Sequence, residues 1–326
     1  MPVLFRRRMD KLSIQDLFFH YGIEIPRRFS RREKDFFLRG CGKVFGACGC
    51  SMKYVHRKVK GTDAANLVIG DVEKADTVLI ANYDTPAHDY GNPMYYYPLD
   101  GRASLMASLV PTYAPALVSI MIIIYILWAW RKYIDFAKRP LLSFLLVAVM
   151  VLATILGWLF SGNVGNRINM NRNTSGVVAV MAILQELSPA AREKTAAILS
   201  DDGCYGHAGD YLSRSEFPCL DKKHVIVFNC VGNGSDLLIG YRHDSHALAK
   251  EAAAVLKGSQ MIACEGNALK YSSFSFYPSG ILIARADTDT HVVKNVGGKD
   301  TDVDPESVKE LCDSLSGWLN QKYQSR

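Results

Sequence analysis

Three short groups of polar residues carry the side-chain types that acid–base or metal chemistry requires. They lie at 82–84, 201–207 and 287–291 of the 326-residue chain. The side chains that they contribute are Asn82, Asp84, Asp201, Asp202, Cys204, His207 and His291. Paired carboxylates beside a histidine can hold a divalent metal, or can divide the general-acid and general-base roles of a hydrolysis. Aspartate and asparagine also form ordinary turns and helix caps, so a purely structural role stays open.

Each of these groups follows a short apolar run that predicts a β-strand. The predicted strands are 66–70, 77–82, 196–200, 225–230 and 281–286, and the predicted helices are 11–21, a segment capped by Ser30, 174–187, 245–256 and 305–319. Strands that alternate with helices indicate an α/β fold with a mixed, mainly parallel sheet and helices on both faces. Strands 66–70 and 77–82 are expected to be neighbours. The three polar groups should meet at one sheet edge, where such folds bind ligands.

The order of these segments resembles one enzyme family. The matching segments are Asn66–Ile69, Val78–Thr85, Asn171–Val178, Ile198–Gly209 and His291. Together they are similar to the zinc aminopeptidases of metallopeptidase family 28, which are relatives of glutaminyl cyclases. The resemblance covers roughly residues 60–110 and 165–320, and it implies an aminopeptidase-like fold.

Most positions that would supply zinc ligands in that family carry other residues here. Asn82 replaces the first histidine, Arg172 the bridging aspartate, Gly203 and Cys204 the two glutamates, and Ser272 the later aspartate. Only His291 and Asp84, which resembles a supporting carboxylate, remain. We therefore expect no metal cofactor of the two-zinc kind, and we expect Arg172 to pair with Asp84, Asp201 or Asp202. The alternative is a shifted site in which Asp201, Asp202, Cys204, His207 and His291 hold a single zinc ion.

Two long uncharged segments interrupt the α/β pattern. No Asp, Glu, Lys or Arg occurs from Ala103 to Trp130 or from Pro140 to Asn166. A helix needs about 20 apolar residues to cross a bilayer, so 113–130 and 141–160 predict a transmembrane helical hairpin, with the lipid bilayer as its partner. Two buried core helices are the alternative, but neither segment has a polar face.

Charge is distributed unevenly along the chain. Residues 1–60 hold 15 Lys or Arg against 5 Asp or Glu, a net +10 that leaves −4 for the rest. The basic clusters 6–8 and 27–32 fit anionic lipid, and no nucleic-acid partner is expected. The basic loop 131–139 would lie in the cytoplasm by the positive-inside rule, which would export the folded domain. Because 112 residues without a signal sequence precede the first span, we instead expect a cytoplasmic domain.

The sequence therefore predicts three parts. A basic N-terminal helical segment spans 1–60, an aminopeptidase-like domain spans 61–110 and 163–326, and the membrane hairpin spans 111–162. The hairpin should emerge at the rim of the active-site mouth of the resembled family. The expected function is that of a membrane-anchored pseudopeptidase that binds a peptide, a lipid-linked ligand or a partner protein. The alternative is an active hydrolase with a rebuilt single-metal or metal-free site around Asp84, Asp201, Asp202 and His291.

Overall fold

The domain is built on an eight-stranded mixed sheet with the order β1-β2-β5-β3-β6-β9-β7-β8. The computed structural model describes residues 11–47, 49–88, 94–133 and 139–324. The strands of the sheet are β1 (Met52–Val59), β2 (Thr62–Ile69), β3 (Thr77–Asn82), β5 (Thr195–Ser200), β6 (His224–Phe228), β7 (Asp236–Tyr241), β8 (Gln260–Ala263) and β9 (Gly280–Ala286). The central strands β5, β3, β6 and β9 are parallel, whereas β2 and β7 pair antiparallel with β5 and β9. This topology confirms the predicted α/β class with a mixed, mainly parallel sheet.

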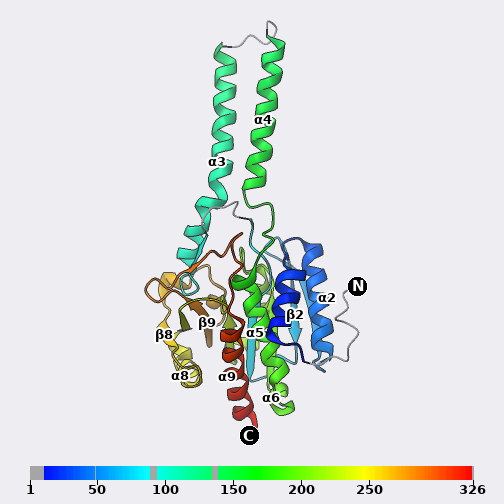
Figure 1. Ribbon diagram of the computed structural model, residues 1–326, viewed down its shortest axis with the longest axis vertical. Coiled ribbons are helices and arrows are strands. Elements are labelled where there is room, and N and C mark those ends of the chain that lie inside the picture. The colour runs from blue at the N-terminus through cyan, green and yellow to red at the C-terminus, as the bar shows by residue number, and fades with distance from the viewer. Residues whose placement is uncertain (1–10, 48, 89–93, 134–138, 325–326) are drawn as a thin grey trace.

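Helices cover both faces of the sheet (Figure 1). They are α1 (Ile14–Phe18), α2 (Arg31–Ala47), α5 (Ser175–Glu186), α6 (Pro189–Glu193), α7 (Ala208–Glu216), α8 (His246–Val255) and α9 (Pro305–Gln324). Helices α1, α2, α5, α8 and α9 share one core cluster with one face of the sheet, and α7 packs on the other face. A second, small sheet pairs β4 (Tyr95–Tyr96) with β10 (Val293–Lys294).

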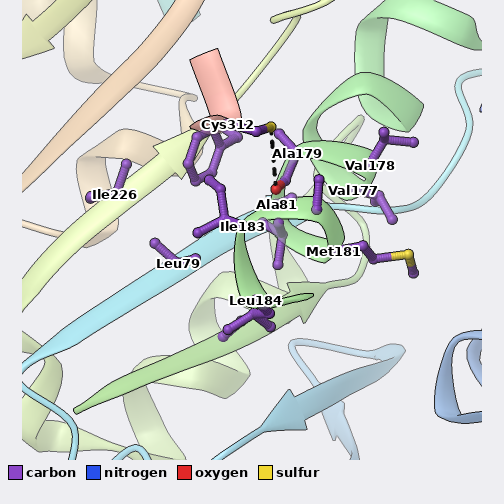
Figure 2. Packing of buried hydrophobic residues seen from close by; sticks show 14 of the residues in the cluster. Leu79, Ala81, Val177, Val178, Ala179, Met181, Ile183, Leu184, Ile226 and Cys312 are labelled. Atoms are coloured by element: carbon purple, nitrogen blue, oxygen red, sulfur yellow. Dashed lines mark hydrogen bonds between the residues drawn. The ribbon is translucent and has the colours of Figure 1, made fainter. Parts of the chain in front are cut away.

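Successive side chains of β3 point to opposite faces of the sheet, so this strand contributes to two separate hydrophobic cores. All six residues of this strand are buried, as expected for a central parallel strand. Leu79 and Ala81 belong to the core under α5 and α9, and Val78 and Ile80 belong to the core under α7. Figure 2 shows Leu79 and Ala81 close to the residues of α5. Burial of apolar surface on both faces fixes the strand at the centre of the molecule.

The N-terminal segment is part of this core. Helix α1 and the π-helical turn η2 (Phe19–Glu24) follow each other directly and together cover most of the predicted helix 11–21. Leu17 and Phe37 are fully buried against the α5–α9 layer. Residues 52–59, which the sequence placed in a helical segment, instead form strand β1 in a hairpin with β2. The basic cluster 6–8 lies outside the described residues.

Two long helices project together from one end of the domain (Figure 1). They are α3 (Gly101–Tyr133) and α4 (Pro140–Phe160), and both are long and apolar enough to cross a membrane. Only 6% and 17% of the residues in their apolar windows are buried, so they are not core helices of this domain. Most of the predicted loop between them, 134–138, lies outside the described residues. Helix α3 begins twelve residues before the predicted span because its first turns pack against the domain at Lys270–Ser272.

Several features of the topology differ from the sequence prediction. Strands β2 and β3 are not neighbours, because β5 lies between them. Strands β7 and β8 and helix α7 had no predicted counterpart. The other predicted strands and helices lie within a few residues of β5, β6, β9, α5, α8 and α9.

Candidate functional site

Three aspartates meet where β3 and β5 end. The two strands pair in parallel with Asn82 opposite Ser200, so Asp84 lies beside Asp201 and Asp202, and all three are buried. The amides of Gly203 and Cys204 donate to the two carboxylate oxygens of Asp84 at 2.9 and 3.1 Å. The structure thus brings together the carboxylates from two of the predicted polar groups.

A lysine pairs with one member of this acidic cluster. Lys34 Nζ of α2 lies 2.6 Å from Asp201 Oδ1, and the amide of Ala65 donates to Asp201 Oδ2 at 3.1 Å. Burial alone would lower the pKa of Lys34, but the charges of Asp84 and Asp201 raise it. The lysine is therefore a fixed cation among the three carboxylates. No motif in the sequence marks Lys34, because its role depends on how α2 packs against the sheet.

Asp202 is held by backbone amides in a strained conformation. Its φ is 57°, in the left-handed region, and its Oδ2 accepts hydrogen bonds from Gly206 N at 3.2 Å and Ala208 N at 3.3 Å. Burial and the charge of Asp84 raise the pKa of Asp202 to about 6. Burial also raises the pKa of Asp201, despite Lys34.

Asn82 fills the space beside the cluster. Its Nδ2 donates to Ser273 Oγ at 2.8 Å, whereas its buried Oδ1 has no hydrogen-bond partner among the described residues. A Cβ at Gly203 would lie 2.1 Å from Asn82 Cγ. Position 203 therefore admits only glycine while Asn82 is present, so it cannot carry a ligating glutamate.

His207 has acceptors at both ring nitrogens. Nδ1 lies 3.2 Å from Asp210 Oδ2 and 3.1 Å from Ser273 Oγ, and Nε2 lies 3.0 Å from the carbonyl oxygen of Tyr271. Burial disfavours the charged ring, but the hydrogen bond and charge of Asp210 outweigh burial and raise the pKa of His207. Ser273, His207 and Asp210 do not form a nucleophile–base–acid relay, because serine and aspartate contact the same nitrogen. The sequence analysis missed Ser273 and Asp210 and named the adjacent Ser272 instead.

Arg172 does not pair with the aspartates, which corrects the sequence prediction. Its guanidinium lies over the ring of Tyr96, 4.7 Å from the centroid, and its side chain forms no ion pair with a described carboxylate. Its backbone amide donates to Asp300 Oδ2 at 3.0 Å. The second small sheet places Tyr96 beside Arg172, so the aromatic ring replaces the expected carboxylate as its partner.

The remaining predicted residues have separate roles. Cys204 Sγ accepts a hydrogen bond from Asn173 Nδ2 at 3.1 Å, and burial together with the charge of Asp84 raises the pKa of its thiol. Ser272 Oγ accepts from Phe274 N at 3.2 Å and so caps the short helix η7 (Ser273–Phe276). His291 lies in the turn between β9 and β10, where its amide donates to Asp287 O at 2.9 Å. Its ring has no hydrogen bond or ion pair with the aspartate cluster in the described structure.

The donor set does not fit zinc. A zinc ligand must present a lone pair from thiolate, neutral imidazole or carboxylate. Here burial raises the pKa of the Cys204 thiol, and the hydrogen bond and charge of Asp210 raise the pKa of His207. Lys34 or backbone amides contact at least one oxygen of each aspartate. Over residues 11–47, 49–88, 94–133 and 139–324, no three His, Cys, Asp or Glu side chains are arranged to hold a metal. Neither the two-zinc arrangement nor the shifted single-zinc site is supported by these side chains.

The fold of this chain is similar to that of several proteins of known structure. No family model and no curated protein matches the chain. Solved structures of glutaminyl cyclases and aminopeptidases do match its fold, as the resemblance predicted. The glutaminyl cyclase of Porphyromonas gingivalis is 12% identical, with a TM-score of 0.54, and the match covers 96% of this chain and 100% of that one. The LapA aminopeptidase of Legionella pneumophila is 10% identical, with a TM-score of 0.57, and the match covers 95% and 71%. A leucine aminopeptidase precursor from Bacteroides thetaiotaomicron is 12% identical, with a TM-score of 0.56, and the match covers 95% and 98%.

Proposed function

We propose that this chain is a membrane-anchored, aminopeptidase-like pseudopeptidase, a degenerate member of metallopeptidase family 28. It binds a peptide, a lipid-linked ligand or a partner protein at the carboxyl edge of its sheet. One observation carries the proposal: Lys34 Nζ lies 2.6 Å from Asp201 Oδ1, within the acidic cluster that follows β3 and β5. A permanent cation at this place opposes the binding of a second, metallic one.

Two further features support the loss of hydrolytic chemistry. The aminopeptidase reaction needs an activated water and a free carboxylate base. Both oxygens of Asp84 and Oδ2 of Asp202 accept backbone hydrogen bonds, so these three oxygens are directed into the protein. Asn82 and Gly203 interlock at the positions aligned with zinc ligands, which leaves no side chain there to hold an ion.

The anchor in this proposal is the α3–α4 hairpin. Large apolar side chains on both helices are open to solvent, among them Tyr125 and Leu141, which are 66% and 73% exposed. A soluble domain rarely exposes a contiguous apolar surface of this kind, whereas a bilayer would cover it. The hairpin then holds the domain against the membrane, with the domain on the cytoplasmic side.

An active hydrolase is the second candidate, and the raised pKa of Asp202 favours it. A carboxyl group with a pKa of about 6 is suited to general acid or base catalysis near neutral pH. In this reading Asp202 would act without metal, and its two amide contacts would loosen when the substrate binds.

Activity and metal content decide between the two candidates. The full chain in detergent should be assayed with aminoacyl and N-terminal glutaminyl peptides, with and without added zinc, manganese or cobalt. The proposal expects no stoichiometric metal and no turnover above that of Asp202→Asn. Robust turnover that is abolished by Asp202→Asn would establish the metal-free hydrolase. Metal-dependent turnover lost in Cys204→Ala and His207→Ala would instead establish a rebuilt metal site.

A further inference from the structure

A polar cavity lies to one side of the aspartate cluster. Its volume is about 240 Å³, below the roughly 300–1,000 Å³ of pockets for drug-sized ligands, so it suits a small occupant. Its walls come from η3 (Met170–Thr174), the turn after β6, the end of β9, strand β10 and residues 299–302. Neither Asp84, Asp201 and Asp202 nor His291 lines it.

The walls of the cavity are fixed by backbone contacts. Asn171 Oδ1 accepts hydrogen bonds from Gly232 N at 2.8 Å and Asn233 N at 3.1 Å. Gly234 has a φ of 152°, and a Cβ there would lie 2.4 Å from Ala286 N. The turn after β6 therefore packs directly on the end of β9, and the cavity is preformed.

Asp300 presents a buried carboxylate to this cavity. It is 3% exposed, and its two oxygens accept hydrogen bonds from Asn171 N and Arg172 N, each at 3.0 Å. It forms no ion pair within the described part of the chain. Burial raises the pKa of Asp300 to about 6, although the two amide contacts and the charges of Arg172 and Arg28 act in the opposite direction. A cation bound in the cavity would give this carboxylate a direct ion pair.

Lysine side chains line the same cavity. Lys299 is exposed and forms no ion pair with any residue that the structure describes, and Lys294 Nζ lies 3.6 Å from Asp287 Oδ2. Three aspartates also contribute to the lining, but no group of three metal-ligating side chains is found among the described residues. The cavity thus offers a carboxylate and an available ammonium group at separate points, rather than a cage for an ion.

We propose that this cavity binds a small zwitterion, a dipeptide with free termini. Its ammonium group lies at Asp300 and its carboxylate at Lys299. The inference deepens the proposed function, on which it rests for the peptide class of the ligand. This inference differs from the sequence prediction in placing the ligand beside the aspartate cluster and not on it. Charge-assisted hydrogen bonds of this kind give both affinity and orientation.

Titration calorimetry on the full chain in lipid nanodiscs tests the site. L-alanyl-L-alanine should bind, whereas its N-acetyl derivative and its C-terminal amide, which each lack one charge, should bind at least tenfold more weakly. Asp300→Asn, which keeps an oxygen for one of the two backbone amides, and Lys299→Met should each weaken dipeptide binding at least tenfold. Asp289→Asn, a charge change on the neighbouring exposed turn, should not alter it.

The result that overturns the proposal is an absence of dipeptide binding, or equal binding of the charged and blocked forms. Should Asp300→Asn fail to fold, the blocked ligands and Lys299→Met still decide the question. Peptidase turnover is measured separately, so an active enzyme that also binds dipeptide here would refute the proposed function and leave this site standing.

Discussion

At the scale of single residues, the candidate site is a network in which most polar groups have a partner elsewhere in the chain, although the buried Oδ1 of Asn82 has none among the described residues. Lys34 pairs with Asp201, Asn82 donates to Ser273, and His207 bonds with Asp210. Buried polar groups are costly unless they are paired. The network therefore stabilises the fold, and it leaves few lone pairs or protons for a substrate.

Replacing Lys34 by methionine should destabilise the protein strongly. Asp201 is completely buried, and removing one member of a buried ion pair costs about 3–5 kcal/mol. Arg172→Met is the matched control: it removes a cation that lies over the ring of Tyr96 and forms no ion pair with a described carboxylate, and such a cation–π contact is worth about 0.5–2 kcal/mol. Chemical unfolding of both variants at pH 7 checks this order. Equal losses, or a larger loss for Arg172→Met, would show that Lys34 is not the main counterion of the cluster.

Asp202→Asn should stabilise the fold at neutral pH. The raised pKa of Asp202, about 6 against an ordinary 3.8, means that the folded state binds its proton more tightly than the unfolded state does. Stability from this group is therefore lost as pH rises from about 4 to 6, by up to about 3 kcal/mol. Asparagine keeps an acceptor for the backbone amides and tolerates the positive φ. Thermal unfolding between pH 4 and 7 should show a flatter profile for the variant, and an unchanged profile would contradict the argument.

The sequence could place the aspartates but not their partners. Asp84, Asp201 and Asp202 follow predicted strands, so their meeting follows from parallel topology. Lys34 comes from a segment distant in the chain, and only the packing of α2 brings it close to Asp201. From the sequence, the positive charge of Arg172 predicts a carboxylate partner. In the structure its partner is the ring of Tyr96, which the small β4–β10 sheet places beside it.

At the scale of helices and strands, the sequence correctly predicts those elements that have a strong local pattern of apolar residues and clear ends. Strand β3 and helix α5 are continuous apolar runs with clear ends, and Pro305 begins α9 where first-turn proline is favoured. Strand β8 is a four-residue edge strand with little burial, so its signal is weak. The insertion of β5 between β2 and β3 depends on long-range pairing, for which no local pattern exists.

Helices α3 and α4 pack closely together at a glycine. A Cβ at Gly157 would lie 2.4 Å from Ser119 Oγ, and that hydroxyl donates to Pro115 O at 2.9 Å. Gly157→Leu should therefore force the helices apart, at a cost of about 1–3 kcal/mol for overpacking, and should lower the thermal unfolding temperature in nanodiscs. Ala148→Leu adds similar bulk on an exposed position of α4 and should have little effect. Similar unfolding temperatures for the two variants would contradict close packing of the hairpin.

At the scale of the whole molecule, the hairpin is attached at the same edge of the sheet as the candidate site. Helix α3 follows the loop after β3, and α4 leads into α5 through a segment where Gly165 pairs with Ala87. The parallel strands end at this edge, and Figure 1 shows the hairpin rising from the domain at one end. A bilayer around the hairpin would thus face the edge of the sheet that carries the aspartate cluster.

The two ends of the hairpin leave the domain close together, so the hairpin can be deleted without separating other parts of the chain. A Cβ at Gly162 would lie 3.2 Å from Thr112 Cγ2, so the two ends of the hairpin stand side by side. Deleting 113–160 and joining Thr112 to Ser161 through a short Gly-Ser linker should leave the sheet and both cores intact. Because the deletion removes the apolar surface that a bilayer would cover, the shortened protein should move from the membrane pellet to the soluble fraction. Its circular dichroism should retain the strand signal, and its unfolding should stay cooperative. The intact chain should resist extraction by high salt or carbonate, and its release under those conditions would show that the hairpin does not insert.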